Sequence, residues 1–194
     1  GIRSYREPWP AQGPTTDVSR IVRTLREQVG VPLDHLMVLE NELANRLDIE
    51  ESMTQWLSAH ADARSVIYLY FVGHAGLDPQ SGEVYLAPYD ATPADQAPRF
   101  VSLRRLQSQL ARINPKLALL FLDATVSPLT SRPTGKDRKP VKAVAPNWRA
   151  ALSNTGEGQG LILQFARNDD GVASPHLLTG LSGSADLDHD GRVT

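Results

Sequence analysis

The chain of 194 residues contains no cysteine. This absence excludes disulfide bridges, thiolate metal ligands and a thiol nucleophile, while it leaves the redox compartment and the localisation open. No apolar run approaches the roughly 18 to 20 residues that a membrane span requires. The first residues also lack the pattern of a signal peptide. We therefore expect the chain as given to be soluble, with no membrane partner.

A strong charge of either sign is also missing. The formal net charge is -2, and no stripe of Lys and Arg is interleaved with aromatic residues, which argues against a nucleic-acid partner. The short basic run "TGKDRKPVK", residues 134–142, is interpreted as a solvated loop. Hydrophobic residues make up 41% of the chain and charged residues 22%, values typical of globular proteins. These values predict a single folded domain over 1–194.

Helix-like and strand-like segments alternate along the chain. Apolar residues at helical spacing, together with capping residues, predict helices over 17–29, 48–60 and 101–113. Short continuous apolar runs predict buried strands over 35–41, 65–72, 116–125 and 160–169. The connecting stretches predict an opening loop over 1–17, a hairpin-like excursion over 82–93, a long loop over about 127–160 with a short helix at 148–152, and a helical turn at 176–181.

This alternation predicts an α/β fold with a mostly parallel central sheet and helices on both faces. In such sheets the functional groups collect beyond the carboxyl ends of the strands. One apolar run leads directly to His74, and another leads to Asp123 and Thr125, so these residues are expected at one edge of the sheet. An imidazole and a carboxylate at one edge suit acid–base or nucleophilic chemistry, although a lone histidine is as often a structural residue.

The stretches around these residues resemble the caspase-like peptidases, the group of caspases, metacaspases and paracaspases. "YLYFVGHAG" followed by "GEVYLAPYDA" is similar to their histidine block, and "LALLFLDATVS" is similar to their cysteine block. "GIRSYREPWP" with "TTDVSRIVRTLRE" resembles their first loop and helix, and "LLTGLSGSADLDHDGRVT" resembles the closing motif of bacterial members. The resemblance covers nearly the whole chain. It implies a three-layer caspase-like fold, whose first strand would precede Gly1.

The sequence departs from the family where the nucleophile belongs. Thr125 stands at the position of the catalytic cysteine, Ala75 follows the histidine where glycine is usual, and the "GxFT" residues before the closing Leu-Leu are missing. A thiol with a pKa near 8.5 forms a thiolate beside a histidine, whereas an alcohol must lose its proton during attack. An internal threonine also has no α-amino group to activate it, and its β-methyl group crowds the attack. We therefore expect an inactive homologue that binds a protein or a basic peptide, or that regulates what is attached to it.

The resemblance also implies a pocket for an Arg or Lys side chain. In metacaspases and paracaspases the aspartate two residues before the cysteine and the aspartate that opens the first helix line this pocket, and they correspond to Asp123 and Asp17. Two buried carboxylates repel each other unless a cation joins them, and Arg suits this role through its bidentate geometry. The alternative interpretation is that Asp17 is only a helix cap and Asp123 only a turn residue.

Two further functions and one metal site stay open at this stage. The first alternative to the inactive binding module is an active endopeptidase that cleaves after Arg or Lys with Thr125 and His74 as its dyad. The second is a structural spacer in a larger chain. "DLDHDG" places Asp186, Asp188 and Asp190 at alternate positions before a glycine, the first half of an EF-hand-type calcium loop. Because the bidentate glutamate of such a loop is missing, calcium is expected to bind weakly, and the alternative is a polar turn. No other cofactor is expected, and the oligomeric state is open.

Overall fold

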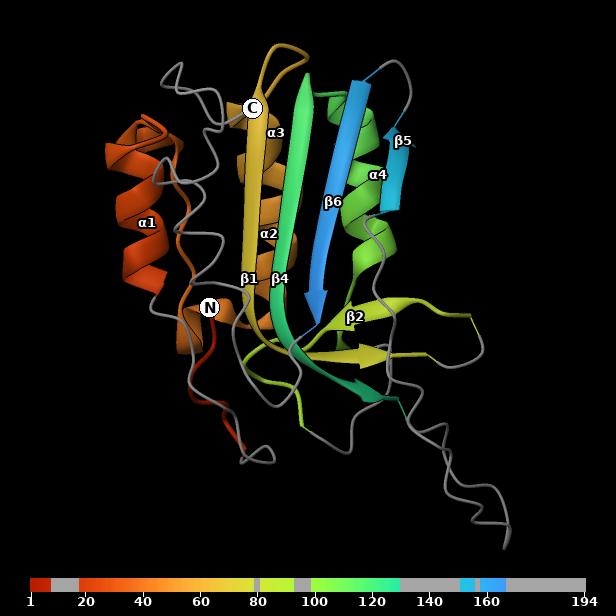
Figure 1. Cartoon of the computed structure of the whole chain (residues 1–194). Helices are drawn as coiled ribbons and strands as arrows, with labels where there is room; N and C mark the ends of the chain where they lie inside the picture. Colours follow the sequence, from red (N-terminus) through yellow and green to blue (C-terminus); the bar gives the residue numbers. More distant parts are fainter. Residues whose placement is uncertain (8–17, 79–80, 93–98, 130–150, 156–157, 167–194) are drawn as a thin grey trace, which may run out of the picture.

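The computed structural model describes one mixed α/β unit. The described residues are 1–7, 18–78, 81–92, 99–129, 151–155 and 158–166. Within these residues, a single sheet contains six strands in the order β3-β2-β1-β4-β6-β5. Figure 1 shows α1 beside β1, and α2, α3 and α4 behind the sheet.

Along the described residues, three α-helices come first, followed by three strands, a fourth α-helix and three further strands. The strands are β1 (Val66–Leu77), β2 (Val84–Leu86), β3 (Val101–Ser102), β4 (Leu117–Pro128), β5 (Ala151–Thr155) and β6 (Gly158–Ala166). The α-helices are α1 (Val18–Glu27), α2 (Arg46–Glu51), α3 (Leu57–His60) and α4 (Leu103–Ile113). Two 3-10 helices, η1 (Leu33–His35) and η2 (Asn41–Ala44), precede α2, and a π-helical turn, η3 (Ser52–Trp56), joins α2 to α3.

The sheet is parallel at its centre and antiparallel at its edges. β4 pairs in parallel with β1 on one side and with β6 on the other. β2 pairs antiparallel with β1 and β3, and β5 pairs antiparallel with β6. The predicted mixed α/β class is therefore confirmed. The mostly parallel sheet and the three-layer arrangement with helices on both faces are not confirmed.

The main core lies between α4 and the two central strands. α4 buries Leu103, Leu106 and Leu110, which recur at helical spacing and therefore share one face of the helix. They join one apolar cluster with Leu120 and Leu122, alternate residues of β4 that point to the same side of the sheet. Aliphatic packing between this helix face and this strand face fixes where β4 lies.

The ends of α4 explain why it forms where the sequence predicts it. The Ser102 side chain accepts a hydrogen bond from the Arg105 backbone N–H at 3.3 Å, as expected of an N-cap. Asn114 ends the helix in the left-handed conformation, with φ 51° and ψ 54°, and its N–H donates to the Leu110 carbonyl at 2.8 Å. The predicted helix 101–113 is confirmed, with its boundary shifted by two residues.

Other predicted elements need correction. Residues 35–41 were expected as a strand, but η1 and η2 occupy the two ends, and 36–40 form no regular element. The predicted helix 48–60 begins earlier, because the Asn45 side chain caps it by accepting from the Asp48 N–H at 3.0 Å. The predicted helix 148–152 is wrong at its described end, where residue 151 begins strand β5. The helical turn 176–181 and most of the loop 127–160 lie outside the described residues.

β1 extends further than the apolar run predicts. The expected strand stops at residue 72, but β1 continues to Leu77 because β4 pairs with it along its whole length and β2 pairs with residues 75–77. His74 therefore lies within a strand instead of beyond its end. Among the described residues, no helix is long and apolar enough to cross a membrane.

Candidate functional site

The register of β1 and β4 brings His74 and Thr125 together. His74 is the Cα partner of Thr125, and Val72 is the partner of Asp123. Adjacent strands lie roughly 4.8 Å apart, and partners in a parallel ladder point to the same face of the sheet. Since side chains alternate along a strand, Asp123 and Thr125 share that face with His74. One patch of one sheet face thus carries an imidazole, a carboxylate and an alcohol.

Burial separates the three side chains into two groups. His74 is 2% exposed and Asp123 is 3% exposed, whereas Thr125 is only half-buried. A carboxylate and an imidazole removed from water interact more strongly with charges than the same groups at the surface. The arrangement is therefore suited to holding a cationic group at Asp123 and to accepting or donating a proton at His74. Thr125 offers a hydroxyl group at the more accessible position.

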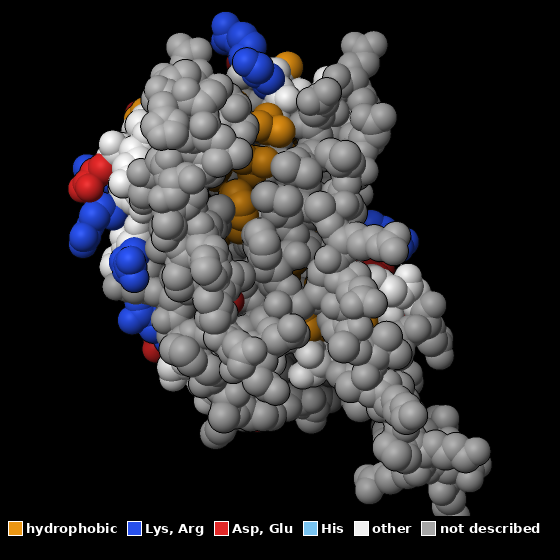
Figure 2. All heavy atoms as spheres, in the orientation of Figure 1, with side chains coloured by type: hydrophobic (Ala, Val, Ile, Leu, Met, Phe, Trp, Pro, Cys, Tyr) orange, Lys and Arg blue, Asp and Glu red, His pale blue; other side chains and the backbone are white. Residues whose placement is uncertain are grey.

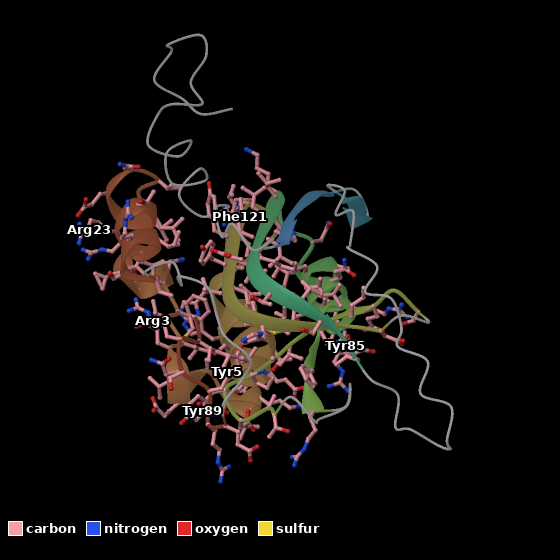
Figure 3. The ribbon with its side chains drawn as sticks, turned by 60° about the horizontal axis from the view of Figure 1, so that its bottom comes forward. Arg3, Tyr5, Arg23, Tyr85, Tyr89 and Phe121 are labelled. Atoms are coloured by element: carbon pink, nitrogen blue, oxygen red, sulfur yellow. The ribbon has the colours of Figure 1, made fainter. Side chains whose placement is uncertain are left out.

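Tyr5 is part of this site, and the sequence analysis did not single it out. Its Oη accepts a hydrogen bond from the His74 backbone N–H at 2.7 Å and lies 3.4 Å from the Ala87 carbonyl oxygen, to which it donates. Its ring centroid is 5.3 Å from that of the His74 imidazole. Figure 3 shows Tyr5 beside this end of the sheet, whereas Arg23 lies apart from it on α1. The only signal in the sequence was the tyrosine inside the opening stretch "GIRSYREP".

The backbone on both sides of His74 is held by specific contacts. The His74 carbonyl oxygen accepts from the Ala87 N–H at 2.9 Å, while its N–H is bound by Tyr5. Gly73 has φ +156°, a backbone conformation that residues other than glycine rarely adopt. A Cβ atom at Gly73 would lie 2.6 Å from the Tyr5 Oη. Glycine before the histidine therefore lets the tyrosine reach the strand.

Tyr5→Phe is expected to destabilise the fold by about 1 to 3 kcal/mol at neutral pH, because the buried His74 N–H loses its acceptor. Burial raises the pKa of the Tyr5 phenol, and the hydrogen bond from His74 partly opposes that shift. A raised folded-state pKa gives stability that is complete below the unfolded phenol's pKa of about 10 and is lost as the pH rises above it. Urea unfolding from about pH 8 to 11 should thus show a steeper alkaline loss in the unmutated protein than in Tyr5→Phe. Equal alkaline slopes would contradict this expectation.

The remaining predicted site residues lie outside the described residues. They are Asp17, of the proposed pocket, and Asp186, Asp188 and Asp190, of the proposed calcium loop. Within the part of the chain that the structure describes, no group of three or more His, Asp or Glu side chains is placed to hold a metal ion. Weak calcium binding by the acidic tail stays a prediction.

Comparisons with known proteins identify no family. No protein-family model matches the chain, and no curated protein sequence matches it. The resemblance to caspase-like peptidases therefore rests on the motifs of the sequence. The site itself is defined by the neighbouring positions of His74, Asp123 and Thr125 on one sheet face.

Proposed function

We propose that this chain is a caspase-like domain that has lost its nucleophile and serves as a binding or regulatory module for a protein or a basic peptide. In this proposal its complete fold is the three-layer arrangement of that family. The observation that supports it is the register of β1 and β4, which pairs the histidine position with the position of the missing cysteine. Unrelated strands with the same residues would have no reason to align these two positions.

The chemistry of Thr125 favours binding over cleavage. A threonine hydroxyl is far less acidic than a thiol, so it requires a well-aligned base at the moment of attack. His74 is the neighbouring base, and its ring is buried against the Tyr5 ring. The β-branched Thr125 side chain is also restricted in its rotamers and places a methyl group beside the hydroxyl. These features would make turnover slow or absent while leaving the surrounding groups in place.

Asp123 is the residue that would recognise the ligand. A buried carboxylate gains most from a cation that also donates hydrogen bonds, and the planar guanidinium of Arg supplies two parallel donors. Asp17 would supply a second carboxylate, as the resemblance implies. The ligand class is thus a peptide or protein segment that presents Arg or Lys.

The direct test measures the binding of labelled peptides that carry Arg, Lys or, as a neutral control, Gln at one position. We expect the Arg peptide to bind more tightly than the Gln peptide, and Asp123→Asn to weaken Arg binding at least tenfold. The matched control is Asp62→Asn, because Asp62 is an exposed carboxylate on the segment before β1, whereas His74 lies near the C-terminal end of β1. Circular dichroism would verify that both variants fold. Equal affinities for the three peptides would reject the acidic pocket and favour the structural spacer.

A second candidate, an active endopeptidase, is favoured by one observation. The register that pairs His74 with Thr125 puts a possible general base, the His74 imidazole, next to the threonine hydroxyl. Incubation with fluorogenic peptides ending in Arg or Lys is expected to give no turnover above buffer. Turnover that Thr125→Ala abolishes would replace the binding module with a working hydrolase.

A further inference from the structure

Two histidines outside the candidate site, His35 and His60, lie side by side. His35 is the last residue of η1 and His60 is the last residue of α3, so they come from separate segments. Their ring centroids are 5.9 Å apart, and the ring planes are nearly perpendicular, at 89°. Both residues are exposed. The fold thus brings two imidazoles together at a place that solvent can reach.

The His60 ring is held by Trp56, which comes four residues earlier in the same helical stretch. The two rings stack, with centroids 4.4 Å apart and planes 19° from parallel. The His60 Nδ1 also lies 2.8 Å from the Trp56 carbonyl oxygen. Since a carbonyl oxygen only accepts hydrogen bonds, Nδ1 carries the proton and donates it, and the lone pair of the neutral imidazole is on Nε2. The Nε2 of His60 can therefore bind a metal ion.

These contacts of His60 are the ones that metal-binding histidines have. Such a histidine usually donates its other ring N–H to a carbonyl or carboxylate oxygen, which fixes the tautomer and the direction of the ring. The bond from Nδ1 to the Trp56 carbonyl oxygen has this role. The stack on the indole restricts rotation of the ring further. Because the ring is already ordered, a bound ion would cost little additional conformational entropy at His60.

The separation of the two rings fits one shared metal ion. A metal–nitrogen bond of about 2.1 Å and a distance of roughly 1.1 Å from the nitrogen to the ring centre place each centroid about 3.2 Å from the ion. Two such centroids are about 4.5 Å apart when the bonds make an angle of about 90°, and about 6.4 Å apart when the bonds point in opposite directions. The observed 5.9 Å lies within this range. A tetrahedral site, at about 5.2 Å, needs only a small rotation of the exposed His35 ring.

The surroundings of the two rings select the kind of ion. His35, Trp56 and His60 line a cavity of about 650 Å³ between β1 and the segment after α1, and no described Asp, Glu, Lys or Arg lines it. Figure 2 shows hydrophobic side chains along the middle of the view, over the sheet. Ca²⁺ and Mg²⁺ require oxygen ligands, which this lining does not offer as carboxylates. Imidazole nitrogens instead suit Zn²⁺, Ni²⁺ and Cu²⁺.

We propose that His35 and His60 together bind one divalent transition-metal ion of the class that prefers imidazole, with water in its remaining coordination positions. The ion would tie η1, after α1, to the end of α3, so that metal binding would stabilise the folded chain. Figure 1 shows α3 beside the start of β1, whereas His74 lies near the C-terminal end of that strand. The metal site is therefore separate from the His74 edge and independent of the ligand bound there.

The test titrates the full chain with Cu²⁺ and follows tryptophan fluorescence. We expect Cu²⁺ to quench Trp56, because its indole stacks on the ring that binds the ion. Excess Zn²⁺, which does not quench, should displace Cu²⁺ and restore the fluorescence, whereas Ca²⁺ should leave it quenched. Since the chain has three tryptophans, Trp56→Phe identifies the source: this variant should lose most of the quenching. Displacement of Cu²⁺ by Ca²⁺ would overturn the proposal, because it would indicate a carboxylate site.

Single histidine variants show whether two imidazoles share the ion. His35→Asn and His60→Asn should each weaken the binding of Cu²⁺ and Zn²⁺ at least tenfold in calorimetric titrations. His176→Asn is the matched control and should leave both affinities unchanged. Because His35 and His60 are exposed, both variants should fold, which circular dichroism verifies. Unchanged affinity in either site variant, or an equal loss in His176→Asn, would overturn the proposal.

Discussion

Gly73→Ala is expected to lower the free energy of unfolding by about 3 kcal/mol. Two causes act together. Alanine rarely adopts the φ of +156° that Gly73 has, and the added Cβ would lie 2.6 Å from the Tyr5 Oη and 3.2 Å from the Phe71 ring. Because Tyr5 also holds the His74 N–H, relief of the contact would move the candidate site. Urea unfolding monitored by circular dichroism measures the loss.

Gly82→Ala is the matched control for the backbone contribution. Gly82 has φ +69° and nothing within 4 Å of the added Cβ, so its replacement should cost only about 1 kcal/mol. In a Tyr5→Phe background the Cβ at Gly73 no longer meets an oxygen, and the cost of Gly73→Ala should fall by about 1 kcal/mol. Identical costs at Gly73 and Gly82 would show that the close approach of Tyr5 is not what requires glycine there.

Leu120→Ala is expected to destabilise the protein by about 3 to 5 kcal/mol, a large part of the 5 to 15 kcal/mol that holds a typical domain together. Leu120 is 2% exposed on the central strand β4 and belongs to the apolar cluster that includes Leu106 and Leu110 of α4. Truncation removes apolar contacts and leaves a cavity between helix and strand, where neither can collapse without moving the other. The urea midpoint should fall while the slope of the transition stays constant.

Leu47→Ala provides the comparison for this substitution. Leu47 is 70% exposed, so the same change in side-chain volume should alter the free energy of unfolding by no more than about 0.5 kcal/mol. If Leu120→Ala were as mild as Leu47→Ala, α4 would not pack on β4 as described. A lower slope in Leu120→Ala would instead indicate a change in the compactness of the unfolded or folded state.

The strongest local patterns predicted their elements well. The apolar runs that became β1 and β4, and the leucines that became the buried face of α4, each need only their own side chains to signal their structure. The apolar run at 35–41 gave a wrong prediction, because a strand forms only where another segment pairs with it. Leu36 and Glu40 have extended backbone, but 36–40 form no strand. A strand needs a partner alongside, and a single apolar run says nothing about that partner.

The sequence by itself determined which segments are apolar, where α4 is capped and which residues follow the buried runs, because these properties depend on positions close together in the chain. Only the tertiary structure decided that His74 lies opposite Thr125, since sliding one strand by a single residue would send the two side chains to different faces. It also decided that Tyr5, 69 positions away, binds the His74 backbone. Contacts of that separation depend on how the whole sheet packs, and no local pattern encodes them.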